Sequence, residues 1–188
     1  MNYSIKPEEH ELRKAKQTVE KALEGAKYVL DKEEDLEINL GYASLEEVGE
    51  FGVFGSAVTP KEVEIFFNPN VEGWKNNLKD LAADLYGQTW FYENSEVNFV
   101  WQQVLASTVG LIVIEKVSEE KEFEIEEFKE EWAEKKTKIS QEISKASENL
   151  SWQLKLDIGH KLLEEHELED FPDLNRSDVL EAGDKLFE

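Results

Sequence analysis

The sequence of 188 residues contains no cysteine. Without cysteine the chain can form neither a disulfide framework nor a thiolate metal site, and this composition is typical of a cytoplasmic protein. Basic residues are also scarce, because 21 lysines and arginines stand against 43 aspartates and glutamates, giving a formal net charge of -22. Such a chain repels phosphate backbones and anionic lipids. We therefore expect neither nucleic acid nor a membrane as a partner.

The acidic excess also indicates the solvent in which the protein works. Repulsion between like charges destabilises a compact chain, and salt screens it over about 8–10 Å or less at and above physiological ionic strength. We expect a soluble, halophilic protein of archaeal type. An ordinary acidic bacterial or archaeal protein is the alternative, because the chain keeps many lysines. Residues 1–14 lack the apolar core of a signal peptide, so we do not expect secretion by that route.

The familiar motifs of several enzyme classes are missing. The sequence has no Gly-x-Ser-x-Gly elbow, no phosphate-binding loop and no dinucleotide-binding turn. His160 and His166 are six residues apart and face different sides of a helix, so they do not form a metal pair. We interpret His10 and His166 as surface residues and His160 as a packing residue. Because carboxylates are abundant, no pair such as Glu93 and Glu96 stands out as an acid and a base.

The aromatic content is sufficient for a hydrophobic core, with 10 Phe, 5 Trp and 5 Tyr. The length fits one domain, residues 1–188, which we divide into an N-terminal helix (1–35), a small sheet (36–72) and a helical part (73–188). The most apolar stretch, residues 99–117, carries two glutamines, a serine and a threonine. We interpret it as a buried core helix rather than a membrane span.

Hydrophobic periodicity predicts an α+β fold that is mostly helical with a small β-sheet of two or three strands. Residues 7–31 repeat apolar positions at helical spacing, and residues 36–40 suit a short strand. A glycine-rich stretch then leads to Pro60. Residues 62–67 alternate acidic and apolar side chains, as a half-buried strand does. The later helices are expected at residues 73–94, 99–117, 123–150 and 151–166, followed by a short helix that Ser177 caps.

One arrangement resembles a known family. A strand ending in Phe67-Asn68-Pro69 precedes a helix over Leu78–Tyr92. This order resembles zinc-dependent proteases of the zincin, gluzincin-like kind, in which a strand edges the cleft and the next helix carries His-Glu-x-x-His. The similarity continues more weakly through Gln103–Leu111 and Ile158–Lys161. It covers about residues 36–186.

In the family motif, two histidines four residues apart bind zinc, and the glutamate between them activates water. The resemblance places Asp84 and Gln88 at the histidine positions, Leu85 at the position of the base, and Val109 or Thr108 at the third ligand. Gln88 is a poor zinc ligand, and Leu85 cannot move a proton. The resemblance therefore implies a zincin-like architecture with a degenerate motif, no catalytic residue, no metal and no cofactor.

From this resemblance we expect a pseudo-metallopeptidase with a binding or structural role and a protein or peptide as its partner. The cleft would lie between the strand at residues 63–67 and the helix turn at residues 84–88. Its expected lining residues are Tyr86, Trp90, Tyr92 and His160.

Two other interpretations stay open. In the first, the chain is an active metal-dependent peptidase that holds zinc through Asp84 and through carboxylates of Glu93, Glu96 or Glu115. In the second, it is an unrelated α+β interaction module that docks its partner on the helix at residues 124–150. An ordinary amphipathic helix would explain the residues at the motif positions in that second case.

Overall fold

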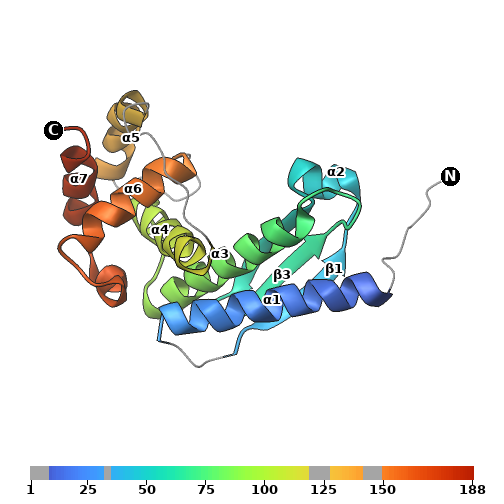
Figure 1. Ribbon diagram of the computed structural model, residues 1–188. Helices are drawn as coiled ribbons and strands as arrows, with labels where there is room; N and C mark the ends of the chain where they lie inside the picture. The colour runs from blue at the N-terminus through green and yellow to red at the C-terminus, as the bar shows by residue number, and fades with distance from the viewer. Residues whose placement is uncertain (1–8, 32–34, 119–127, 142–149) are drawn as a thin grey trace.

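The computed structural model describes residues 9–31, 35–118, 128–141 and 150–188. A small sheet lies at one end of the molecule and a group of helices at the other, with α3 and α4 between them (Figure 1). The prediction of a mostly helical α+β fold is confirmed. The elements in order are α1 (Glu9–Val29), β1 (Glu37–Tyr42), α2 (Leu45–Val48), η1 (Gly49–Phe51), β2 (Val53–Thr59), β3 (Glu62–Phe67), α3 (Trp74–Asn94), α4 (Val100–Val117), α5 (Lys129–Ser140), α6 (Trp152–Leu163), η4 (Leu168–Asp173) and α7 (Arg176–Lys185).

The sheet has three strands in the order β1-β3-β2. β1 is parallel to β3, and β2 is antiparallel to it through a tight hairpin in which Thr59 pairs with Glu62. β3 has the expected bounds, whereas β2 occupies the glycine-rich stretch in which the sequence predicted no defined strand. Because β3 is central, β1 and β2 form the two edges of the sheet.

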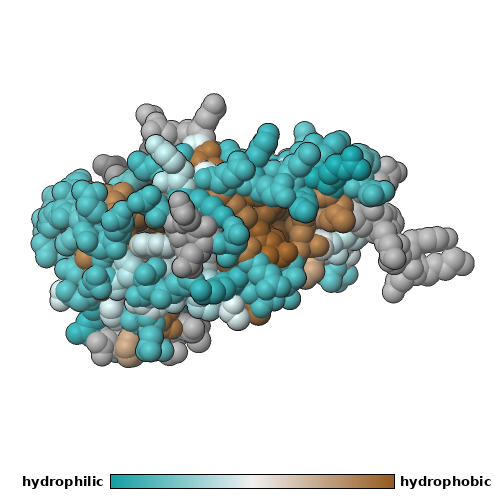
Figure 2. All heavy atoms as spheres, turned by 90° about the horizontal axis from the view of Figure 1, so that it is seen from below, coloured by the Kyte–Doolittle hydropathy of each residue, from teal (hydrophilic) through white to brown (hydrophobic). Residues whose placement is uncertain are grey.

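One face of the sheet is covered by helices and the other is open. Along β3, Val63, Ile65 and Phe67 are buried, while the residues between them are only partly buried. This alternation is the expected result of packing one face of an antiparallel pair against a core. Helices α1 and α3 complete this core with Ala15, Val19, Ala22, Trp74, Leu78, Ala82 and Leu85. Seen from below, Figure 2 shows an apolar area hollowed between polar ridges, in the half of the molecule that holds α1 and the sheet.

Helix α4 lies at the centre of the larger core. It packs against α1, α3, α5, α6, α7 and η4. Among the described residues it is the one helix long and apolar enough to cross a membrane, and 50% of it is buried inside the fold. This packing agrees with the prediction of a core helix.

Glycines let the central helices approach closely. A Cβ atom on Gly87 of α3 would lie 2.7 Å from the Cα atom of Gly110 in α4. Likewise, a Cβ atom on Gly159 of α6 would lie 2.3 Å from the Cγ2 atom of Thr108 in α4. Real Cβ contacts are essentially never so short. The α3–α4 crossing therefore depends on Gly87 and Gly110, and it brings the backbone of α4 close to Asp84 of α3.

Several predicted boundaries differ from the structure. The cap of α7 is Asn175, not Ser177, because the Asn175 Oδ1 atom accepts a hydrogen bond of 2.7 Å from the Ser177 backbone N–H. The helix predicted at residues 151–166 ends at Leu163. Of the long helix predicted at residues 123–150, the structure describes α5, which ends at Ser140. Residues 123–127 and 142–149 lie outside the described residues, and Leu150 is not helical.

Candidate functional site

A pocket of about 620 Å³ opens between β2 and α3. Its volume lies within the range of about 300–1,000 Å³ that is usual for ligand sites. One wall is the second half of β2 with the turn after it, another is α3, and the third is the connection from α3 to α4. The lining residues are Gly55, Ser56, Ala57, Val58, Thr59, Pro60, Leu81, Asp84, Leu85, Gln88, Tyr92, Ser95, Glu96, Val97 and Asn98.

Three polar side chains of α3 follow one another along the pocket. Asp84, Gln88 and Tyr92 recur every four residues, so they share one face of the helix. The Gln88 Nε2 atom donates a hydrogen bond of 2.9 Å to the Asp84 Oδ1 atom. The Tyr92 hydroxyl donates a longer one of 3.4 Å to the Gln88 Oε1 atom. This chain of hydrogen bonds orients the Asp84 carboxylate within the wall of the pocket.

Small residues of β2 shape the opposite wall. Gly55 and Ala57 alternate with exposed residues and belong to the strand face that meets α3. A Cβ atom on Gly55 would lie 3.1 Å from Leu85 Cδ1 and 3.3 Å from Leu81 Cδ2. The absence of a side chain at Gly55 therefore lets the strand approach α3.

The Asp84 carboxyl group is held against the backbone of α4. A Cβ atom on Gly110 would lie 2.0 Å from the Asp84 Oδ1 atom, so the glycine leaves the space that the carboxyl group fills. Burial raises the pKa of Asp84 from 3.8 to about 6, although the hydrogen bond from Gln88 and the charge of Lys155 in α6 act in the opposite direction. Burial also raises the pKa of Tyr92, and the negative charge of Asp84 adds to that effect. Asp84 is thus a partly accessible acid whose charged form is disfavoured by its surroundings.

The free edge of β2 lies beside the pocket. β2 pairs with β3 on one side, and within the described residues no strand pairs with its other side. Alternate N–H and C=O groups of an edge strand point away from the sheet and can pair with another chain. The pocket therefore combines an open backbone edge with the side chains of α3.

The structure brings three of the positions that the resemblance assigns to the metalloprotease motif into this pocket. Asp84, Leu85 and Gln88 all belong to the lining. Val109, the position expected for a third ligand, is 0% exposed within the larger core, and its neighbour Gly110 is the residue that contacts Asp84. The motif positions on α3 therefore share one pocket, while Val109 does not line it.

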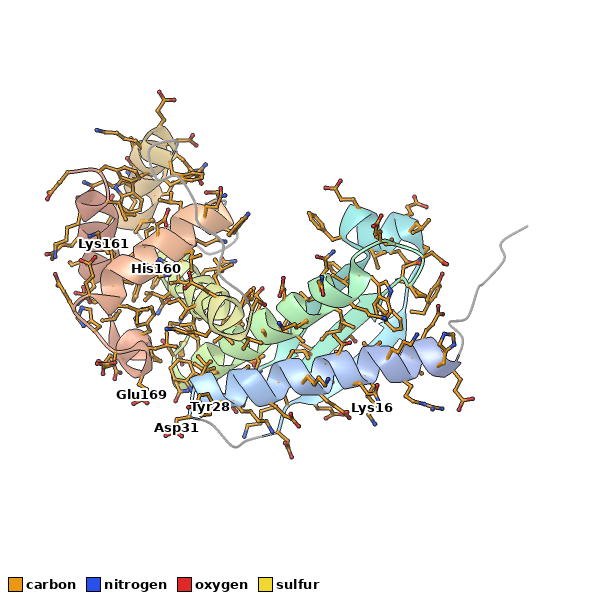
Figure 3. The ribbon with its side chains drawn as sticks, viewed as in Figure 1. Lys16, Tyr28, Asp31, His160, Lys161 and Glu169 are labelled. Atoms are coloured by element: carbon orange, nitrogen blue, oxygen red, sulfur yellow. The ribbon has the colours of Figure 1, made fainter. Side chains whose placement is uncertain are left out.

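The residues expected to line the cleft are divided between the pocket and the rest of the fold. Tyr92 lines the pocket. Tyr86 and Trp90 are buried in the larger core and are not among the lining residues. His160 lies on α6, away from the strands (Figure 3), and its Nε2 atom is 2.7 Å from the Oε2 atom of Glu115 in α4. The pocket also adjoins β2 rather than β3, the strand from which the cleft was predicted.

The carboxylates considered as alternative metal ligands are scattered. Glu96 lines the pocket with Asp84. The Glu93 Oε1 atom is 3.5 Å from the Lys61 Nζ atom, and Glu115 pairs with His160. In the part of the chain that the structure describes, no group of three or more histidine and acidic side chains is placed to hold a metal ion.

No known protein family, curated protein or solved structure matches the chain. The zincin-like resemblance consequently stays a prediction that rests on the residues quoted for it.

The main part of the site that sequence reasoning missed is the wall formed by β2. The sequence pattern indicated only a glycine-rich stretch that leads to Pro60, and no strand was assigned to it. A usable signal was present, since the segment Val53–Thr59 alternates small and larger side chains before a two-residue turn and the clear pattern of β3. This order is typical of a β-hairpin.

Proposed function

We propose that the chain is a non-catalytic, zincin-like domain that binds an extended peptide in the groove beside β2. The observation that supports the proposal most directly is the composition of one pocket. The positions that the resemblance assigns to the metalloprotease motif, Asp84, Leu85 and Gln88, line it together with an open strand edge. An open edge next to a pocket is suited to a ligand that pairs with the strand through its backbone and inserts alternate side chains.

The dimensions of β2 suggest the length of the ligand. A strand rises by about 3.3 Å per residue, so the seven residues of β2 offer an edge of about 20 Å. A peptide of about six residues can pair along such an edge. Its backbone would supply affinity, while side chains that point toward α3 would supply specificity.

The same lining residues argue against peptide hydrolysis. Leu85 stands where a general base is needed, is only 4% exposed and carries no group that can accept a proton. Gln88 is engaged with Asp84 and is a poor zinc ligand. The pocket thus retains groups that can accept hydrogen bonds from a ligand, whereas the position that the resemblance gives to the base holds an apolar side chain.

An active metal-dependent peptidase is the competing function, because Asp84 and Glu96 both line the pocket. It is tested by metal analysis of protein purified without a chelator. Stoichiometric zinc together with cleavage of casein would overturn the non-catalytic proposal. We expect neither.

Peptide binding is tested by screening random hexapeptides against the purified chain and mapping the bound state by hydrogen exchange. We expect a bound peptide to slow exchange of amides in β2, and N-methylation of alternate peptide amides to abolish that protection. β1, the other edge of the sheet, is the internal control and should keep its exchange rates. Protection confined to β1, or no protection of β2 by any peptide in the library, would refute strand addition in this groove.

A further inference from the structure

We infer that the groove selects a segment in which lysine or arginine alternates with apolar residues, with one cationic side chain seated against Asp84. This inference rests on the proposed strand addition and specifies its ligand.

The charged residues of the pocket favour a cationic ligand. Among the described lining residues the two charged ones, Asp84 and Glu96, are both acidic. Leu81 and Leu85 supply apolar surface beside Asp84. A lysine or arginine side chain has matching parts, since its apolar stem packs against such leucines while its charged head reaches an acceptor. The net charge of -22 also attracts basic segments toward the protein.

Asp84 is suited to receive that head. A carboxylate offers about four acceptor positions, and the intramolecular hydrogen bond to Asp84 comes from Gln88 on the same helix. The glycine at position 110 leaves the carboxylate in contact with the α4 backbone, which fixes its position. A cation in the pocket would compensate a charge that burial disfavours. Asp84 therefore gains more from a cationic ligand than Glu96, which is exposed.

The other face of β2 explains why apolar residues should alternate with the basic ones. Successive side chains of a strand point to opposite faces. A strand added beside β2 would thus direct one set of side chains toward α3 and Asp84. The other set would lie next to Phe54, which pairs with Phe66 of β3 and is 55% exposed on the open face of the sheet. Neighbouring apolar side chains on adjacent strands stabilise the pairing.

Other groups near Asp84 set the pH dependence. Gln88 and Tyr92 lie on α3, and Glu96 lies on the connection from α3 to α4. Lys155 lies on α6, and its positive charge lowers the pKa of Asp84. Lys155 and a cationic ligand would both interact with the negative charge of Asp84. The charge of Lys155 does not return the pKa of Asp84 to its usual value, because burial still holds that pKa at about 6. Affinity for the basic peptide should therefore fall as the pH is lowered from 7 to 5.

The probe is the capped, fluorescently labelled peptide Val-Lys-Val-Lys-Val-Lys, measured by anisotropy at 25 °C and about 150 mM salt, where long-range attraction is screened. Two control peptides separate the contribution of the positive charges from the contribution of the alternating order. One replaces each lysine with glutamine, and the other has the block order Lys-Lys-Lys-Val-Val-Val, which keeps the charge but loses the alternation. The matched variants are Asp84→Asn and Glu96→Gln, which remove one negative charge each from the same pocket.

We expect Asp84→Asn to weaken binding of the alternating peptide by about tenfold, the loss typical of one charge-assisted hydrogen bond. Glu96→Gln should weaken it by less than about threefold, as an exposed pair does. The pH dependence near 6 should disappear in Asp84→Asn. Equal losses in both variants, or equal binding of the alternating and block peptides, would overturn the inference.

The peptide series also separates this inference from the function on which it rests. If the glutamine peptide binds as well as the lysine peptide and both protect β2 in hydrogen exchange, strand addition stands and the seat for a cation is refuted. If no peptide protects β2, both proposals fail. Both results are obtained with the parent chain, so a folding defect of a variant cannot produce them. A loss of affinity in Asp84→Asn cannot be attributed to misfolding either, because this variant is expected to be more stable than the parent.

Discussion

Replacing Asp84 with asparagine should stabilise the protein at neutral pH. Burial raises the pKa of Asp84 from 3.8 to about 6. Because the folded pKa lies above the unfolded one, the unfolded state ionises first as the pH rises, so the ionisation opposes folding. Asparagine keeps the shape and can still accept the hydrogen bond from Gln88, but it has no charge to bury.

The size of the effect follows from the two pKa values. Each pKa unit corresponds to about 1.4 kcal/mol, so a difference of about two units corresponds to about 3 kcal/mol. Asp84 is partly accessible through the pocket, and we therefore expect a gain of about 2 to 3 kcal/mol above pH 7. About half of it should remain at pH 5 and almost none below pH 3.5, where aspartate is protonated in both states.

Urea denaturation from pH 3.5 to 8 measures this gain, and thermal melting should show it as an increase of about 4–10 °C near pH 7.5. Glu96→Gln is the control for the general benefit of removing one negative charge from a chain of net charge -22. Its gain should be small because Glu96 is exposed. If Asp84→Asn proves less stable than the parent above pH 6, the reasoning fails, because the charge of Asp84 would then support the fold.

Two further predictions address the helix crossing and the inferred motif. Gly87→Ala should destabilise the protein by about 1–3 kcal/mol in urea, since the new Cβ atom would lie 2.7 Å from the backbone of Gly110. Gly25→Ala is the control, because its new atom would meet only the side chain of Val117, at 3.0 Å, and should cost less. Equal stability of the two variants would contradict this reasoning. The triple variant Asp84→His, Leu85→Glu and Gln88→His should bind zinc, because its two histidines, four residues apart, would face one pocket. Isothermal calorimetry measures this binding, and the single variant Gln88→His is the control. A folded triple variant without zinc affinity would count against the alignment.

The sequence predicted the elements with strong periodicity. β3 was predicted at its observed bounds because acidic and apolar residues alternate along it. α3 and α4 were predicted within about a residue, since each has a long apolar pattern and a clear end. β2 was missed because Gly55 and Ala57 are small, so its inward face carries little of the apolar signal on which the prediction depends.

The site was predictable in part for the same reason. Helical spacing is enough to place Asp84 and Gln88 on one face of α3. It does not indicate how α4 crosses α3, because that depends on the fit of Gly87 against Gly110. Val109, which the resemblance gave as a position of the third ligand, is instead buried in the core.

Asp84 is the residue at which stability and the proposed function have opposite requirements. An acidic side chain packed against a glycine of a neighbouring helix is destabilising at neutral pH, and an uncharged residue of the same shape would remove that cost. Local choices that conflict with the fold are most often found at functional sites, where a ligand compensates them. A cationic ligand would compensate the buried charge of Asp84 in that way, whereas an apolar ligand would leave it buried without a counter-charge. Asp84→Asn should therefore raise the free energy of unfolding and lower the affinity for the lysine peptide for the same reason, the loss of the buried charge. Both effects should decrease together as the pH falls below 6.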